Sequence, residues 1–227
     1  MMHARRLVPF LLALLVPALT ACASGPTSRA KESSRQAQGL YQLAQLDFNQ
    51  GKNQDAIKHA KQAVELDPEN AEIFSFLGIV HLYLSDYAGA EKSLEKAVKI
   101  NPYLTDARNT LGAVYMKTGR LPEARNELLQ CLKDGTYAFP EKVLYNLGTL
   151  ELEEKRTPEA LENFRRAVAA NPNYAKGYYG LGQALLRSGK KDEARSNFEK
   201  VIALDPSSPE AGKSREALGG SGTATQG

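Results

Sequence analysis

The chain has 227 residues, of which 29 are Lys or Arg, 26 are Asp or Glu and 42% are hydrophobic. This near balance of charge argues against a nucleic-acid partner, because such a partner needs a strongly basic face. Only two cysteines are present, so no network of disulfides can form. Packing must hold the fold together, and a chain of this length can bury enough apolar surface for that.

Residues 1–21 are expected to be a signal peptide. Arg5 and Arg6 precede the apolar segment "LVPFLLALLVPAL", which is too short and too interrupted by proline to span a membrane stably. The following Leu19-Thr20-Ala21-Cys22 resembles a bacterial lipobox. That resemblance implies cleavage before Cys22 and covalent lipid on it, which would anchor the chain in a membrane. The alternative is an ordinary signal peptide with a chance cysteine.

Residues 22–36 are expected to be a tether between the lipid and the first helix, disordered over most of its length and helical from about Lys31. A unit of 34 residues then recurs, with a helix-ending proline at position 32 of most units and small residues at positions 8 and 20. The five units are 37–70, 71–104, 105–140, 141–174 and 175–208. Position 8 is Ala44, Gly78, Gly112, Gly148 and Gly182, and position 20 is Ala56, Ala90, Ala124, Ala160 and Ala194.

Each unit has apolar residues at helical spacing in two segments, which a polar or glycine-bearing turn separates. The small residues at positions 8 and 20 allow two antiparallel helices to approach closely. Five such units in register resemble the tetratricopeptide repeat. The expected fold is all-α, a right-handed tetratricopeptide-repeat superhelix of about five helix pairs. A C-terminal capping helix is expected at 209–218 and a disordered tail at 219–227.

The sequence shows no catalytic constellation, phosphate-binding loop or metal-ligand cluster. His59 and His81 fall on different predicted helices, and Cys131 takes a position where the repeat has a small buried residue. For His81 and Cys131, a packing role is favoured over catalysis or redox chemistry. We therefore expect no enzymatic activity, no metal, no small-molecule substrate, and no cofactor other than the covalent lipid on Cys22.

In tetratricopeptide repeats the first helix of each pair lines a concave groove. Position 12, one of the groove positions, is apolar in every unit, and position 5 is tyrosine in three of them. The predicted partner-binding groove consists of Tyr41, Phe48, Ile79, Leu82, Tyr83, Met116, Tyr145, Leu152, Tyr179 and Leu186. Such a track usually binds an apolar or amphipathic segment of a partner. The alternative is that position 12 packs against neighbouring helices.

The repeat is irregular between its third and fourth units, which start 36 residues apart instead of 34. The two extra residues lie in "CLKDGTYAFPEKVLYNLG", residues 131–148, where the proline due at position 136 is replaced by Thr136 and Pro140 opens the next helix. We expect this longer connection to shift the stacking angle between the two halves of the superhelix.

The segment Tyr137-Ala138-Phe139-Pro140-Glu141, followed by Tyr145-Asn146-Leu147-Gly148, resembles the corresponding part of the type IV pilus pilotin lipoproteins (the PilF/PilW/Tgl family). With the lipobox and the repeats, this resemblance implies a lipid-anchored protein of the outer membrane that faces the periplasm. It further implies that the protein binds secretin subunits and promotes their outer-membrane localisation and multimerisation. The alternative is a general periplasmic scaffold lipoprotein of cell-wall or polysaccharide-export machinery.

Overall fold

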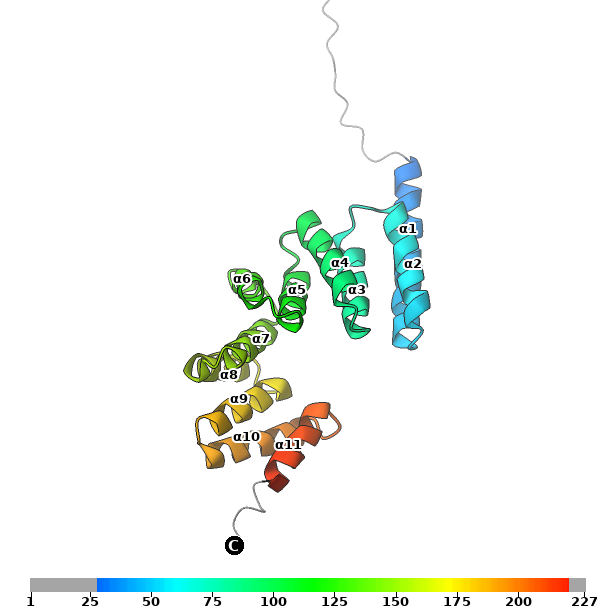
Figure 1. Ribbon diagram of the computed structural model, residues 1–227. Helices are drawn as coiled ribbons and strands as arrows, with labels where there is room; N and C mark the ends of the chain where they lie inside the picture. The colour runs from blue at the N-terminus through cyan, green and yellow to red at the C-terminus, as the bar shows by residue number, and fades with distance from the viewer. Residues whose placement is uncertain (1–27, 221–227) are drawn as a thin grey trace, which may run out of the picture.

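The computed structural model describes residues 28–220, and this part of the chain forms eleven helices and no strand. Figure 1 shows successive helix pairs stacked along a curve, with α1 and α2 at one end and α11 at the other. The predicted all-α superhelix of five helix pairs and a final helix is confirmed. The helices are α1 (Ser28–Asn49), α2 (Asn53–Leu66), α3 (Ala71–Tyr83), α4 (Tyr87–Ile100), α5 (Thr105–Lys117), α6 (Leu121–Cys131), α7 (Pro140–Glu153), α8 (Thr157–Ala170), α9 (Ala175–Arg187), α10 (Lys191–Leu204) and α11 (Pro209–Gly220).

The first helix begins slightly earlier than the sequence predicted, at Ser28 instead of about Lys31. Residues 28–36 of the expected tether form the first turns of α1. They are held against the end of α2, because the Ser33 hydroxyl donates to the Leu66 carbonyl at 2.7 Å and Ala37 is fully buried. The expected signal peptide, Cys22 and the last part of the tail (221–227) lie outside the described residues.

Small residues set the close approach of the two helices within a pair. A Cβ atom added to Gly78 would lie 2.4 Å from Cγ of Leu94 on the partner helix. At Gly182 it would lie 2.7 Å from Cε1 of Phe198. Since real Cβ contacts are not this short, glycine at these positions gives the partner's large side chain its space.

The turn inside each pair has the same backbone geometry in all five units. One residue per turn has a positive φ of 59–76°: Gly51, Ser85, Gly119, Lys155 and Gly189. The next amide donates to the carbonyl five residues earlier, as Arg156 does to Glu151 at 2.8 Å, which is the Schellman helix ending. These turns are 34, 34, 36 and 34 residues apart, which places the insertion between Gly119 and Lys155.

The core is divided into three clusters along the stack. One cluster joins α1, α2 and α3, a second joins α4 through α7, and a third joins α7 through α10 with α11 packed against it. Phe74 packs against both the first and the second cluster. Each pair therefore covers the apolar face of the next, as expected for a repeat protein whose units cannot bury their surface alone.

An ion cluster strengthens the junction that contains the insertion. Arg125 on α6 reaches Glu151 at the end of α7, with 2.5 Å between Nη1 and Oε1, and it also pairs with Glu154. Arg156 completes the cluster through the same two carboxylates. Because the Glu151 side chain is nearly buried, its charge depends on these two guanidinium groups for compensation.

Among residues 28–220, no helix is both long enough and apolar enough to cross a membrane.

Candidate partner-binding surface

An aromatic patch lies across α1 and α3 at the N-terminal end of the stack. We define it as Tyr41, Phe48, Phe76, Ile79 and Tyr83. The Phe48 ring lies 5.9 Å from Phe76 and 5.3 Å from Tyr83, and Tyr41 lies 5.6 Å from Phe76, all edge to face. Seven-residue spacing on each helix puts these rings on one face.

The outer part of the aromatic patch is open to solvent. Tyr83 is 68% exposed and Ile79 is 40% exposed, while Phe76 beneath them is buried. Rings that contact each other lose little further side-chain freedom when a partner covers them. The patch therefore combines an ordered base with accessible apolar surface, which is the arrangement that suits an apolar partner segment.

A shallow cavity of about 290 Å³ adjoins the aromatic patch between α1, α3 and the start of α5. Gln45, Glu72 and Asp106 give it polar edges around Phe76 and Ile79. Burial, reinforced by the charge of Glu72, raises the pKa of Tyr41. The Tyr41 hydroxyl therefore stays protonated and can donate a hydrogen bond to a partner at the cavity edge.

Farther along the stack the predicted groove is not a continuous surface. Leu152 was predicted to line it, but this side chain is only 5% exposed and belongs to the cluster formed by α7 to α10. The prediction was wrong for Leu152, because α8 and α9 cover this side of α7. Leu82 and Met116 are half-buried and pack against the second core cluster. Much of their surface is therefore not available to a partner.

Two of the four predicted groove residues of the last two pairs, Tyr145 and Tyr179, pack against neighbouring rings. Tyr145 lies 5.8 Å from Phe164 and 6.0 Å from Tyr174, and burial raises its pKa. Tyr179 packs against Phe198 and accepts a hydrogen bond from Gln183 at 3.0 Å. Leu186 is exposed. Partner binding by the groove residues that remain accessible stays a prediction.

The inserted connection between α6 and α7 is fixed onto α5. The Tyr137 hydroxyl donates to Asp106 at 2.6 Å, and the Thr105 hydroxyl donates to Asp134 at 2.8 Å. Asp134 also accepts from the hydroxyl and the amide of Thr136, and these hydrogen bonds lower its pKa. Burial raises the pKa of Tyr137, so its hydroxyl remains a donor. The two extra residues thus form a structured connection.

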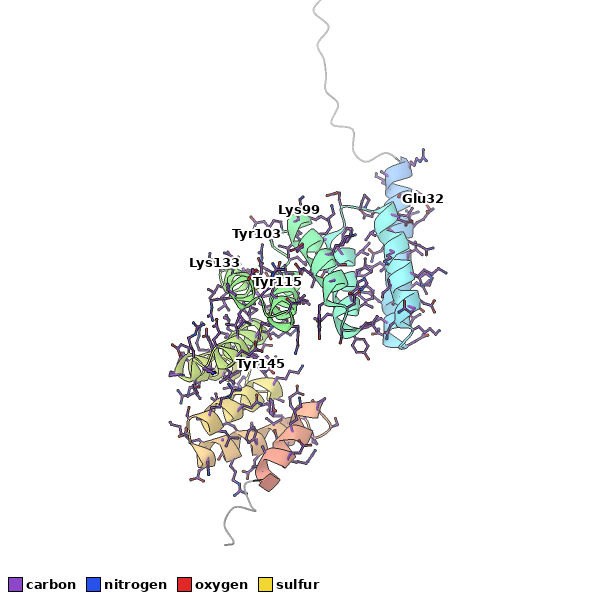
Figure 2. The ribbon with its side chains drawn as sticks, viewed as in Figure 1. Glu32, Lys99, Tyr103, Tyr115, Lys133 and Tyr145 are labelled. Atoms are coloured by element: carbon purple, nitrogen blue, oxygen red, sulfur yellow. The ribbon has the colours of Figure 1, made fainter. Side chains whose placement is uncertain are left out.

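Two accessible aromatic residues beside this connection were missed by the sequence prediction. Tyr103, between α4 and α5, is 88% exposed, and Figure 2 shows it at the outer edge of the stack. Phe139 is 44% exposed, with its ring 6.0 Å from Tyr137 and the Lys142 ammonium 4.1 Å from its centroid. The sequence prediction considered only repeat positions on helices, and both residues lie in connections between helices. An aromatic residue in a connection was the signal that could have identified them.

Residues 28–220 contain neither a metal-binding cluster nor a reactive thiol. No group of three or more His, Cys, Asp or Glu in residues 28–220 could hold a metal ion. Cys131 is buried, its thiol faces the Thr105 carbonyl at 3.6 Å, and burial raises its pKa to about 12. Because the thiolate is the reactive form, this cysteine is a packing residue in the folded chain.

Comparison with protein families identifies the repeat. Models described as tetratricopeptide repeat match residues 41–105 and 145–209, and a further one matches residues 81–135. The matched segments cover all five helix pairs and together exceed half of the chain.

Individual relatives give finer information. The chain is 25% identical over 166 residues to the type IV pilus assembly protein PilF of Pseudomonas aeruginosa, covering 70% of this chain and 65% of PilF. The crystal structure of PilW, described as a widely conserved type IV pilus biogenesis factor, matches with a TM-score of 0.72 and 21% identity, over 81% of this chain and 86% of PilW. The CTR9 homolog of Arabidopsis thaliana is 30% identical over 128 residues, which are 56% of this chain but 12% of that protein.

Proposed function

The chain belongs to the tetratricopeptide repeat family, and from this premise we propose that it is a noncatalytic assembly factor for the type IV pilus. The similarity to PilF carries the proposal, because it covers 70% of this chain. The similarity to the CTR9 homolog covers a small part of a much larger protein, so it reflects shared repeats and supports no function.

The aromatic patch is the surface through which this assembly factor would act. Tyr83 and Ile79 expose apolar surface above the buried Phe76, and such a surface is stabilised when a partner covers it. The partner in this proposal is a secretin subunit, whose apolar segments need protection before they are buried in a multimeric pore. Binding would thereby promote secretin localisation and multimerisation, which is the action of a pilotin.

Lipid on Cys22 would place the protein at the periplasmic face of the outer membrane. Several acyl chains anchor a protein stably, whereas a single chain binds only marginally. A Cys22→Gly variant should therefore move from the membrane fraction to the soluble fraction. A variant that stays fully membrane-bound would contradict lipid anchoring.

Deletion of the gene is the direct test of the pilotin role. The expected result is a loss of denaturant-resistant secretin multimers from the outer membrane, together with a loss of surface pili. Normal multimers and normal pili would refute the role and would favour a periplasmic scaffold for cell-wall or polysaccharide-export machinery.

Complementation with surface variants tests the aromatic patch itself. Tyr83→Lys combined with Ile79→Lys should fail to restore secretin multimers, because it places charge where an apolar segment would dock. The matched control is Leu129→Lys, which changes a comparably exposed apolar residue on α6. Circular dichroism of the purified variants should show unchanged helix content. Full restoration by the double variant would exclude the patch while leaving the pilotin role intact.

A further inference from the structure

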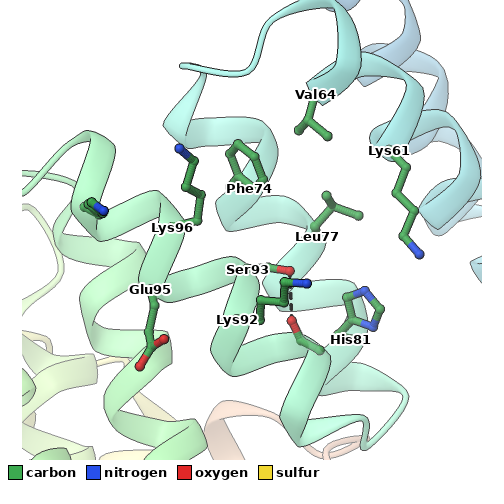
Figure 3. Close-up of a pocket in the computed structure, with 11 residues that line it drawn as sticks. Lys61, Val64, Phe74, Leu77, His81, Lys92, Ser93, Glu95 and Lys96 are labelled. Atoms are coloured by element: carbon green, nitrogen blue, oxygen red, sulfur yellow. Dashed lines mark hydrogen bonds between the residues drawn. The ribbon is translucent and has the colours of Figure 1, made fainter.

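A second hollow lies on the other side of α3, between α2 and α4. Its volume is about 690 Å³, within the range of ligand-binding clefts. Val64, Phe74 and Leu77 provide its apolar surface. Figure 3 shows Phe74 and Leu77 between Lys96 on one side and Lys61 with Val64 on the other. We call this hollow the lysine groove.

The lysine groove concentrates positive charge. Its lining contains Lys61, Lys92, Lys96 and Lys99 and one acidic residue, Glu95. Four minus one gives a formal charge of +3 with histidine neutral, which equals the charge of the whole 227-residue chain.

These lysines leave most of their charge available. Within residues 28–220, only Lys96 among the four has an ion-pair partner, Glu69, at a distance of 3.8 Å. Both of those side chains are well exposed, so the pair contributes little and can be exchanged for another carboxylate at small cost. Lys61, Lys92 and Lys99 have no carboxylate within ion-pair distance among residues 28–220.

The arrangement of the lysines indicates the kind of ligand. Lys92, Lys96 and Lys99 follow i, i+4, i+7 spacing on α4, so they form a row along one edge of the groove. Seven residues of helix extend about 10 Å, which matches a row of carboxylates on a peptide better than a single anionic head group. The apolar surface beside the row would receive the apolar side chains of the same peptide.

We propose that the lysine groove docks an acidic amphipathic segment of a partner protein, with Asp or Glu along one edge and apolar side chains along the other. This mode combines apolar burial with charge pairing, as in other helix-in-groove complexes. The site is separate from the aromatic patch and does not depend on the identity of the partner that binds there.

Selection from a display library of random 16-residue peptides tests this inference. The chain from residue 23 to 227, which retains every described helix, is the bait. Selected peptides are measured by fluorescence anisotropy against the wild type and against Lys92→Glu/Lys99→Glu. The matched control is Lys176→Glu/Lys213→Glu, which makes the same change of charge at exposed lysines on α9 and α11.

The expected result is a class of acidic amphipathic peptides whose affinity falls at least about tenfold in the groove variant and decreases with added salt. The control variant should bind this class as the wild type does. The inference is overturned if no selected peptide responds to the groove variant, or if the responding peptides lack acidic residues. It is also overturned if the groove variant binds vesicles containing phosphatidylglycerol more weakly than the wild type does, while no selected peptide distinguishes the two proteins. The groove would then bind a lipid surface.

Discussion

The substitution Gly180→Ala probes how neighbouring helix pairs fit together. Gly180 on α9 contacts Phe164 on α8, whose side chain is fully buried. A Cβ atom at Gly180 would lie 2.3 Å from Cε1 of Phe164 and 2.6 and 2.7 Å from two more ring atoms. The same ring edge lies 2.7 Å from a Cβ built at Gly148, so both glycines are needed to accommodate it.

Two opposing effects decide the outcome of this substitution. Alanine within a helix is favoured over glycine by about 1 kcal/mol. Overpacking a filled core costs about 1–3 kcal/mol, and the three contacts below 3 Å place Gly180 toward the upper part of that range. We therefore expect Gly180→Ala to lower the free energy of unfolding by about 1–2 kcal/mol.

Equivalent positions in other units suggest a compensating change. In each unit, the residue equivalent to Phe164 is followed 16 residues later (18 across the insertion) by the residue equivalent to Gly180. A large side chain at one of these two positions goes with a smaller residue at the other. The pairs are Ala60 and Phe76, Leu94 and Thr110, Leu128 and Asn146, and Phe164 and Gly180. Leu94 and Leu128 each occur with a residue larger than glycine at the second position. A leucine in place of Phe164 should therefore leave space for the alanine side chain of Gly180→Ala. The double variant should lose at least about 0.5 kcal/mol less than the sum of the two single variants.

Urea unfolding followed by circular dichroism at 222 nm measures these free energies. The control is Gly39→Ala in α1, where a Cβ atom would meet nothing within 4 Å, so that variant should gain about 0.5–1 kcal/mol. If Gly180→Ala stabilises the protein as Gly39→Ala does, the packing argument is refuted. Strict additivity of the Phe164 and Gly180 variants would refute the compensation.

Three other predictions concern the turns, the buried thiol and the ion cluster. Lys155→Gly should raise the free energy of unfolding by about 0.5–1 kcal/mol, because lysine is strained at a φ of 62°; a fall in urea midpoint would contradict this. Cys131, whose pKa is raised to about 12, should react with Ellman's reagent at pH 8 only after unfolding. The unfolded thiol ionises first as pH rises, so the contribution of Cys131 to stability should be fully present below about pH 9 and lost progressively as the pH rises toward 12; fast labelling of the folded chain would disprove its burial. Arg125→Ala should cost about 1–3 kcal/mol by leaving Glu151 with one guanidinium partner, whereas the exposed Arg165→Ala should change the urea midpoint little.

The repeat architecture could be predicted from the sequence because its determinants are local. Helical spacing, the small residue at Gly148 and the turn at Gly189 each act within one helix pair, and they recur with a fixed period. The period also located the insertion. The start of α1 at Ser28 was missed, since the polar residues there become helical by packing against the end of α2.

The sequence by itself therefore determined the all-α superhelix, its five pairs and the position of the irregular connection. Only the tertiary structure decided which apolar residues are accessible: Tyr83 is exposed, whereas Leu152 at a neighbouring repeat position is buried. The sequence also could not show that Lys61 and Lys96 border one groove, since they lie on α2 and α4. The physical reason is the same in both cases. Periodicity fixes which face of a helix a residue occupies, whereas exposure and charge clustering depend on which distant helix covers that face.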